Sequence, residues 1–262
     1  MGLLDDRVVL ISGVGPGLGH ETAAAVLDEG GRVVLTDMFG DRVEKIRADL
    51  DPGGERSLAV EVDITSAAHC AALPERVRAR FPHVHGIVNV AAFDDPVGGL
   101  MDDDVLDDWD RAAAVNVKGT LRVTKAMVPL MPPDGGSIVI IGSTSFARTR
   151  RTRWNLAYGM SKGALVTATY FLADELGPSG IRTNTVAPGW KWGPRVEGYF
   201  DGEAARRGVD RQVLVDAISE ELSLRRMATD RDVANAAVFF LSDMSRAITG
   251  QTIFVDGGHV FR

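Results

Sequence analysis

The chain has 262 residues, of which 45% are hydrophobic and 25% are charged, and its formal net charge is −7. This composition is that of an ordinary globular protein with enough apolar material for a core, and the acidic balance argues against a nucleic-acid partner. The only cysteine, Cys70, excludes an internal disulfide and a cysteine-rich zinc site. We therefore expect a cytoplasmic protein without a resident metal. The apolar run near the start is broken by glycines before it reaches signal or membrane-span length, so we expect no membrane contact.

Seven short runs rich in β-branched residues recur along the chain, separated by segments long enough for crossover helices. They lie at residues 8–11, 33–36, 58–62, 87–90, 138–141, 183–187 and 252–255. Several runs are apolar almost throughout, as expected for parallel strands that are covered on both faces. The sequence therefore predicts an α/β fold with a single doubly wound parallel sheet of about seven strands, helices on both faces and one domain over residues 1–262.

A glycine pattern follows the first expected strand and opens a helix. Gly13, Gly17 and Gly19 stand where glycines let the backbone approach a pyrophosphate, which the amides of the helix N-terminus then bind. Asp37 ends the next strand, at about the spacing where an acid accepts hydrogen bonds from adenosine ribose hydroxyls. A 2′-phosphate would meet this carboxylate, so NAD is favoured over NADP. Arg42 is a cation able to turn back toward it, and a helix-capping role is the alternative for Asp37.

Tyr158 and Lys162 lie four residues apart in a helix-compatible stretch, so their side chains share one helix face. The lysine charge favours the phenolate and brings the pKa of the tyrosine from about 10 toward working pH, which makes it a usable acid or base. Ser143 ends an apolar run upstream, and its hydroxyl can hold a substrate oxygen by a hydrogen bond. With the glycine pattern, these residues predict a hydride-transfer enzyme.

Taken together, these motifs resemble the short-chain dehydrogenase/reductase family over nearly the whole chain. The resemblance implies a Rossmann fold and a catalytic tetrad of Asn116, Ser143, Tyr158 and Lys162. It implies that Tyr158 exchanges a proton with the substrate, that Lys162 binds the nicotinamide ribose and that Asn116 holds a water for proton relay. The cofactor contacts that the resemblance and the glycine pattern imply are Gly13, Gly17, Leu18, Gly19, Asp37, Asp63, Ile64, Asn89, Ala91, Tyr158, Lys162, Pro188 and Gly189.

Some positions depart from the family pattern. Val90 and Ala92 replace the usual second Asn and the final Gly after the central strand. Ser143 precedes Tyr158 by more residues than is common, so Ser145 is a competitor for the serine role. Gly193 stands where the family often has a Thr that contacts the nicotinamide carboxamide, so another group must make that contact.

An irregular insertion at residues 190–225 follows a strand end, includes a polar stretch that we expect to be helical, and predicts a substrate lid. Glycines on both sides of Trp190 and Trp192 provide permissive backbone positions, so we expect a mobile loop that is open or poorly ordered without substrate. Aromatic residues near the expected active-site mouth favour an apolar or ring-containing substrate, and core packing is the alternative for each of them. The substrate candidates are Ser145, Trp154, Trp190 and Trp192.

A basic run of four arginines lies between the serine and the tyrosine. It suits a solvated or inter-subunit ion-pair patch, or alternatively the recognition of an anionic substrate tail. Its members are Arg148, Arg150, Arg151 and Arg153.

The leading interpretation is an NAD-dependent oxidoreductase that acts on a small-molecule secondary alcohol or ketone. The family resemblance also implies a homotetramer. One alternative is an NADPH-dependent ketoreductase for a carrier-bound acyl substrate, which Asp37 opposes. Another is a non-catalytic nucleotide-binding protein, which the intact set of Ser143, Tyr158 and Lys162 opposes.

Overall fold

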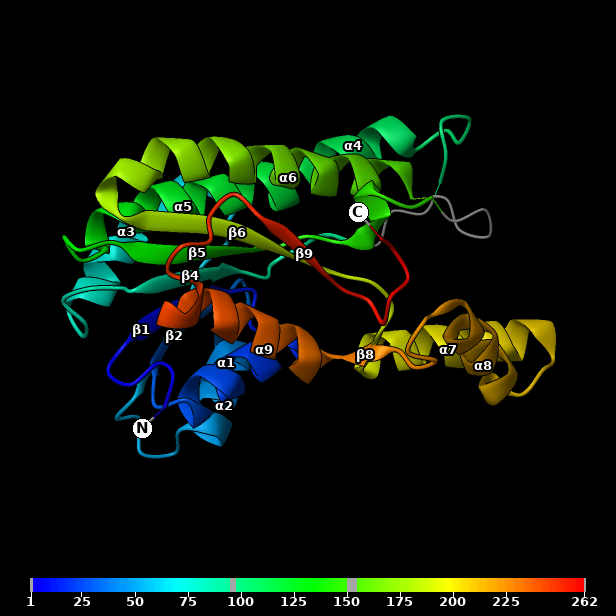
Figure 1. Cartoon of the computed structure of the whole chain (residues 1–262), viewed down its shortest axis with the longest axis horizontal. Coiled ribbons are helices and arrows are strands. Elements are labelled where there is room, and N and C mark those ends of the chain that lie inside the picture. The colour runs from blue at the N-terminus through cyan, green and yellow to red at the C-terminus, as the bar shows by residue number, and fades with distance from the viewer. Residues whose placement is uncertain (1, 95–97, 150–154, 262) are drawn as a thin grey trace.

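A seven-stranded parallel sheet forms the centre of the structure, a computed structural model that describes residues 2–94, 98–149 and 155–261 (Figure 1). The strand order is β3-β2-β1-β4-β5-β6-β9. The order reverses between β1 and β4, and ligands of such sheets bind at this point, outside the carboxyl ends of the strands. The strands are β1 (Val8–Ser12), β2 (Arg32–Asp37), β3 (Ser57–Glu61), β4 (Gly86–Asn89), β5 (Gly136–Ile141), β6 (Ile181–Pro188) and β9 (Thr252–Val255).

Helices cover both faces of the sheet, which confirms the predicted doubly wound fold (Figure 1). One face carries α1 (Leu18–Asp28), α2 (Gly40–Leu50) and α9 (Asp230–Leu241). The opposite face carries α3 (Ala67–Arg78), α4 (Val105–Ala112), α5 (Thr120–Met127) and α6 (Leu156–Leu176). A π-helical segment at Ala113–Gly119 joins α4 to α5.

The two apolar layers of the core explain why the strands have such uninterrupted hydrophobic sequences. In β1, Val9 and Ile11 pack toward α1 and α9, whereas Val8 and Leu10 pack toward the opposite helical layer. All five residues of β1 are buried because both faces of the strand are covered. The seven strands lie within one or two residues of their predicted positions.

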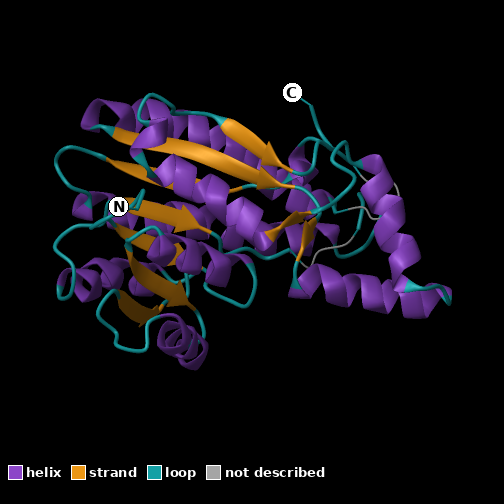
Figure 2. Ribbon diagram, turned by 60° about the horizontal axis from the view of Figure 1, so that its bottom comes forward, coloured by secondary structure: helices purple, strands orange, loops and turns teal. Residues whose placement is uncertain are grey.

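Beyond the carboxyl ends of the strands, residues 190–229 form a small helical unit (Figure 2). It consists of β7 (Lys191–Trp192), α7 (Pro194–Arg207), α8 (Arg211–Glu221) and β8 (Ala228–Thr229), with β7 and β8 paired in parallel. Trp190, Phe200, Leu222 and Met227 form its own buried cluster. The expected helical stretch is therefore present, and the role of the unit as a lid stays a prediction.

The segment after β9 returns to this helical unit and completes it. The Asp256 carboxylate accepts hydrogen bonds from the backbone N–H groups of Gly258 and Val260, both at 2.9 Å. Ser223, which follows α8, donates to the carbonyl oxygen of Gly258 at 3.0 Å. Residues 256–260 are therefore fixed against the chain that follows α8. Within the described residues, no helix is both long enough and apolar enough to cross a membrane.

Candidate active site

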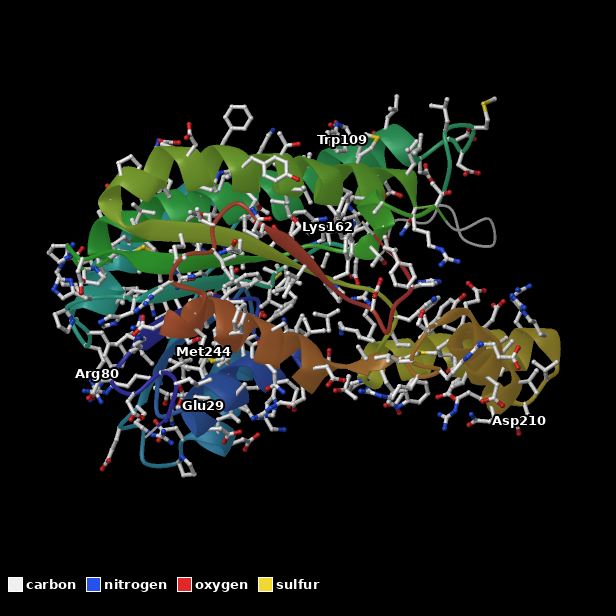
Figure 3. The ribbon with its side chains drawn as sticks, viewed as in Figure 1. Glu29, Arg80, Trp109, Lys162, Asp210 and Met244 are labelled. Atoms are coloured by element: carbon white, nitrogen blue, oxygen red, sulfur yellow. The ribbon has the colours of Figure 1, made fainter. Side chains whose placement is uncertain are left out.

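The side chain of Lys162 lies between α6 and the sheet, next to Tyr158 (Figure 3). Its Nζ donates a hydrogen bond to the carbonyl oxygen of Ile141 at 2.8 Å and lies 5.5 Å from the centre of the Tyr158 ring. The lysine is 2% exposed, whereas the tyrosine is half-buried. The predicted juxtaposition of the ammonium and the phenol on one helix face is therefore present.

Burial lowers the pKa of Lys162 from 10.5 to about 8, and the negative charge of Asp94 opposes this shift. A charged amine loses hydration when it is removed from water, so burial favours its neutral form. The group is still mostly protonated at neutral pH. Its positive charge is thus available to stabilise a phenolate at Tyr158 near pH 7.

The lowered pKa of Lys162 predicts a specific dependence of stability on pH. Above pH 8 the folded protein releases this proton, whereas the unfolded chain keeps it up to about pH 10.5. The unfolded state then binds more protons, so this lysine makes the free energy of unfolding rise with pH across that window. Relative to Lys162→Met, the cofactor-free protein should gain roughly 2–4 kcal/mol between pH 7 and pH 10.5. Urea denaturation at several pH values measures this gain, and a constant difference between the two proteins would contradict it.

Ser143 and Ser145 lie together at the end of β5. The Ser143 hydroxyl donates to the Ser145 hydroxyl at 3.1 Å and accepts from the Ser145 backbone N–H at 3.1 Å. Asn155 donates to the Ser145 hydroxyl at 3.4 Å. Both serines have a hydroxyl at this edge of the sheet, so Ser145 remains an alternative to Ser143.

The Asn116 side chain holds the chain after β4 against α6. Its Oδ1 accepts from the backbone N–H of Phe93 at 2.6 Å, and its Nδ2 donates to the Phe93 carbonyl at 3.0 Å and to the Ser161 hydroxyl at 2.9 Å. The residue is fully buried in the π-helical segment, a feature common at functional sites. The side-chain amide is occupied by these bonds, and the water-binding role implied by the family resemblance stays a prediction.

The glycine-rich turn, here called the glycine cradle, packs so closely on its surroundings that two of its glycines leave no room for a side chain. A Cβ atom on Gly13 would lie 2.4 Å from the Cα of Ala91, and one on Gly19 would lie 2.3 Å from the carbonyl oxygen of Gly13. Gly17 has φ of +105°, which favours glycine, and it precedes the first turn of α1 at Leu18. The backbone amides at this helix start and the close backbone approach fit a bound pyrophosphate.

Asp37 lies at the carboxyl end of β2 and is 6% exposed. Its Oδ1 accepts from the Phe39 backbone N–H at 3.1 Å and from Arg42 at 2.5 Å. Its Oδ2 makes no hydrogen bond with any residue in the described ranges, so it is available to a ribose hydroxyl. Arg42, the cation that could turn back toward Asp37, is therefore in direct contact with this carboxylate.

The remaining predicted cofactor residues lie along the same edge of the sheet. The Asp63 carboxylate accepts from both the backbone N–H and the hydroxyl of Thr65, and these bonds lower the pKa of Asp63, the hydroxyl bond having the largest effect. Ile64 is buried and Pro188 ends β6. A Cβ atom on Gly189 would lie 2.6 Å from that of Asp256.

Asn89 ends β4, and its Nδ2 donates to the Thr124 hydroxyl at 3.2 Å. Its Oδ1 is buried without a hydrogen-bond partner among the described residues. The amide therefore connects the central strand to α5.

The aromatic substrate candidates occupy different environments. Trp190 is 8% exposed, and its ring centre lies 5.5 Å from those of Tyr199 and Phe200, so it packs inside the helical unit. Trp192 is half-buried and stacks on Phe200 at 6.1 Å. Trp154 lies outside the described residues.

Arg148 is the member of the basic run within the described part of the chain. It forms an ion pair with Glu221 of α8 at 2.8 Å and donates to the carbonyl oxygen of His259 at 3.2 Å. Arg148 thus joins the serine loop to α8 and to the C-terminal segment of the same chain. Arg150, Arg151 and Arg153 lie outside the described residues.

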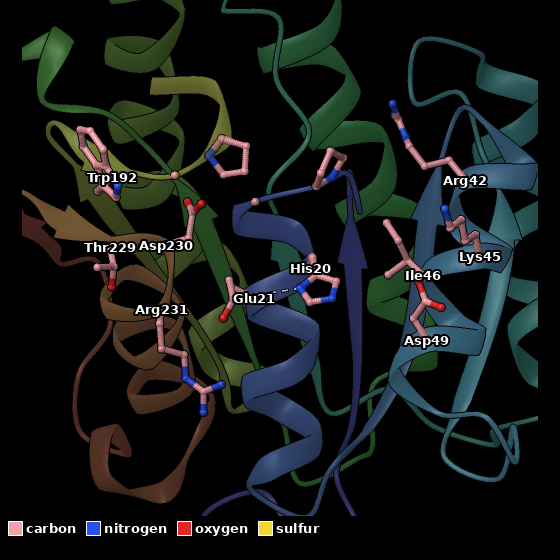
Figure 4. Close-up of a pocket in the computed structure, with 14 residues that line it drawn as sticks. His20, Glu21, Arg42, Lys45, Ile46, Asp49, Trp192, Thr229, Asp230 and Arg231 are labelled. Atoms are coloured by element: carbon pink, nitrogen blue, oxygen red, sulfur yellow. Dashed lines mark hydrogen bonds and ion pairs between the residues drawn. The ribbon is translucent and has the colours of Figure 1, made fainter. Parts of the chain in front are cut away.

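A pocket of about 660 Å³ lies on the outer side of the glycine turn, between α2 and the start of the helical unit (Figure 4). His20 and Glu21 reach it from α1, and Asp230 points toward the start of that helix. None of Ser143, Tyr158 and Lys162 lines it, so this pocket is separate from the catalytic side chains.

Two ion pairs near this site were missed by sequence reasoning. The Lys191 Nζ lies 2.5 Å from the Asp230 carboxylate, whose other oxygen is 3.2 Å from where a Cβ on Gly17 would lie. The Arg195 guanidinium lies 2.7 Å from the Asp94 carboxylate. Asp230 is the first residue of α9. An acidic residue is common at a helix start, so the sequence alone did not indicate this ion pair. Among the described residues, no cluster of three or more His, Cys, Asp or Glu side chains has the geometry to hold a metal ion.

Comparison with known proteins matches this site to an enzyme family. A family model described as "Enoyl-(Acyl carrier protein) reductase" matches residues 13–259. The chain is 32% identical to 2-(S)-hydroxypropyl-CoM dehydrogenase 3 of Xanthobacter autotrophicus, over 97% of both chains. It is 31% identical to D-threitol dehydrogenase of Mycolicibacterium smegmatis, over 99% of this chain and 95% of that one. L-sorbose reductase from Gluconobacter frateurii, solved with NADPH and L-sorbose, has a similar structure with a TM-score of 0.90 and 26% identity over the whole of both chains.

A doubly wound sheet with a glycine cradle at its switch point, next to a Tyr–Lys pair, defines a dinucleotide-dependent oxidoreductase. The chain belongs to the short-chain dehydrogenase/reductase family, whose members bind a nicotinamide dinucleotide. The resemblance predicted from sequence is thereby confirmed.

Proposed function

We propose that this protein is an NAD-dependent oxidoreductase that interconverts a secondary alcohol and its ketone. The observation that carries the proposal is the buried Lys162 ammonium next to the Tyr158 ring, at the same sheet edge as the glycine cradle. A charged group is costly to bury, so its position beside a phenol is best explained by chemistry.

We assign each residue a role in the reaction from the chemistry of its side chain. A nicotinamide bound at this site would supply the hydride chemistry. Tyr158 takes the hydroxyl proton during oxidation and returns it during reduction, while Ser143 holds the same substrate oxygen. Lys162 keeps positive charge next to the phenol and would bind the nicotinamide ribose, as the family resemblance implies. Asn116 positions the chain after β4 against α6 through its bonds to Phe93 and Ser161.

The choice of NAD rests on Asp37. Its free Oδ2 can accept a hydrogen bond from a ribose hydroxyl group. A 2′-phosphate would instead bring two negative charges toward a buried carboxylate, and the two groups would repel. The contact between Arg42 and Asp37 weakens that repulsion and favours NADP as the second candidate. The NADPH-dependent ketoreductase for carrier-bound acyl groups therefore stays the alternative activity.

The predicted preference for an apolar or ring-containing substrate has less support than the reaction itself. Trp190 has a packing role in the helical unit, and of the described tryptophan candidates Trp192 keeps a partly exposed ring. We propose a lid function for residues 190–225 as a packed unit that moves as one body.

A screen of secondary alcohols and ketones with NAD and with NADP tests the proposal. Oxidation by the purified protein is measured from the absorbance of the reduced nicotinamide. Activity with NAD that depends on Tyr158 supports the assignment. A protein that binds the dinucleotide but turns over no alcohol or ketone would favour the non-catalytic alternative.

We also propose cytoplasmic residence, on the basis of the single cysteine.

We further propose a homotetramer, as the family resemblance implies. The outer face of α6 exposes Tyr170 and Phe171, and the neighbouring α4 exposes Leu106, with exposures of 54%, 72% and 70%. Large apolar side chains on adjacent helices suit helix-on-helix packing between subunits. Light scattering should give the mass of four chains, and Phe171→Glu should give smaller species. A monomer at micromolar concentration would refute the assembly.

A further inference from the structure

The serine loop, defined here as residues 143–148, packs directly on α6, the helix that carries Tyr158 and Lys162. A Cβ atom on Gly159 would lie only 3.1 Å from the carbonyl oxygen of Ser145. A side chain at this position would push the loop away, so the glycine permits the close approach. Because Gly159 directly follows Tyr158 in the chain, the loop meets the helix beside the phenol.

Hydrogen bonds inside the loop connect its two ends. The Thr144 carbonyl oxygen accepts from the backbone N–H groups of Ala147 and Arg148, both at 2.9 Å. The Ser143 hydroxyl accepts from the backbone N–H of Ser145 at 3.1 Å. Since Thr144 is bonded to Ser143, a displacement at the Arg148 end of the loop changes the position of the Ser143 hydroxyl.

The side chain of Arg148 holds the far end of this loop against the helical unit. Its guanidinium donates to the carboxylate of Glu221, the last residue of α8, at 2.8 Å and to the carbonyl oxygen of His259 at 3.2 Å. The same Glu221 oxygen lies 3.2 Å from the His259 Nε2. Arg148 thus binds two segments of the chain that also contact each other.

The pair of Arg148 and Glu221 is partly open to solvent, with exposures of 38% and 50%. Exposed ion pairs add little to the overall stability of a protein. Removal of the contact should therefore leave the fold intact and change mainly the local position of the loop.

We propose that Arg148 is a positioning residue, which makes the placement of the serine hydroxyl depend on the position of the helical unit. This inference rests on the proposed alcohol–ketone chemistry, in which a serine of the loop holds the substrate oxygen. Arg148 touches neither the substrate nor the cofactor in this role. It acts through the loop, which lies between α6 and the end of α8.

The arrangement connects movement of the lid to the reaction. A hydroxyl group stabilises the reacting oxygen only within hydrogen-bond distance, and a misplacement of about 1 Å can lower a rate on the order of 10²-fold. When the helical unit moves as one body, Glu221 moves with it, and Arg148 transmits the movement to the serine loop. The substrate oxygen is then held best when the unit occupies the position that this contact fixes.

The first experiment separates turnover from cofactor binding. We would measure kcat and KM with the best secondary alcohol, and the Kd of NADH by fluorescence, in the wild type and in Arg148→Met. The value of kcat should fall about tenfold, because the serine hydroxyl loses its fixed position. The Kd of NADH should stay unchanged, because the glycine cradle is not altered. Arg148→Lys keeps the charge and should restore part of kcat.

A double-mutant cycle assigns the effect to the contact with Glu221. Glu221→Gln should also lower kcat, and the double variant should be no slower than Arg148→Met, because both changes remove the same contact. Arg7→Met is the matched control. Arg7 pairs with Asp243 at 2.7 Å at the amino edge of the sheet, and its loss should leave kcat unchanged.

Hydrogen exchange tests the hold on the loop without any measurement of activity. In the cofactor-free protein, the backbone amides of residues 143–148 should exchange faster in Arg148→Met than in the wild type. The amides of β5, which precede the loop, should keep their rates. Faster exchange throughout β5 would indicate a general loss of structure and would overturn the positioning role.

The outcomes distinguish this inference from the proposed function. A wild-type protein that oxidises alcohols, with the same kcat in Arg148→Met, would overturn the positioning role alone. A wild-type protein that oxidises no alcohol with NAD or NADP contradicts the proposed reaction, and the role of Arg148 in that reaction fails with it. Unchanged exchange at residues 143–148 overturns the hold on the loop in either case.

Discussion

Replacing Tyr158 by Phe should lower kcat by a factor on the order of 10² to 10⁴, while binding of the dinucleotide persists. The substitution keeps the ring next to Lys162 and removes the hydroxyl that exchanges the substrate proton. The hydride step then proceeds without a positioned acid or base. Steady-state kinetics with the best secondary alcohol and fluorescence titration of NADH measure the two effects separately.

Tyr170→Phe is the matched control for this experiment. Tyr170 lies on the same helix with 54% of its surface exposed, away from the catalytic groups in sequence and in burial. The control should retain the wild-type rate. A Tyr158→Phe variant with near-wild-type turnover would falsify the proposed mechanism.

The second large effect concerns the choice of cofactor at Asp37. We expect NAD to bind more tightly than NADP by a factor of roughly 10² to 10³, because like charges about 4 Å apart repel by about 4 kcal/mol at an effective dielectric constant of 20. The contact with Arg42 offsets part of this repulsion. Asp37→Ala combined with Met38→Arg should reverse the preference, since Met38 is 55% exposed beside the same strand end.

Arg42→Ala provides the internal control for the cofactor experiment. It removes the cation that partly neutralises Asp37, so the preference for NAD should widen. Dissociation constants for both dinucleotides decide the question. Equal or tighter binding of NADP by the wild-type protein would refute the role given to Asp37.

The sheet and the cofactor turn were predictable because their signals are local. Strands covered on both faces require apolar runs, and the glycine turn requires residues without side chains at Gly13 and Gly19. The pairing of Tyr158 with Lys162 follows from helical spacing alone. In each case, the constrained residues are close together in sequence, so their pattern can be recognised from the sequence alone.

The contacts around the helical unit were not predictable, because they join residues distant in sequence. Lys191 meets Asp230, and Arg195 meets Asp94, across elements whose relative position only the fold defines. Arg148 stood in a basic run that suited two surface roles, but it pairs with Glu221 of its own chain. Trp190 was assigned to substrate from its location in sequence, whereas its neighbours in space are Tyr199 and Phe200.

The late return of the chain to the helical unit bears on how the protein matures during synthesis. The strand β9 pairs with β6, and residues 256–260 then contact the chain after α8. The glycine cradle and the first strands can form while the ribosome is still translating, but the sheet edge beside Pro188 waits for residues 252–260. Until residues 252–255 pair with it, β6 presents an unpaired edge that other chains can recognise.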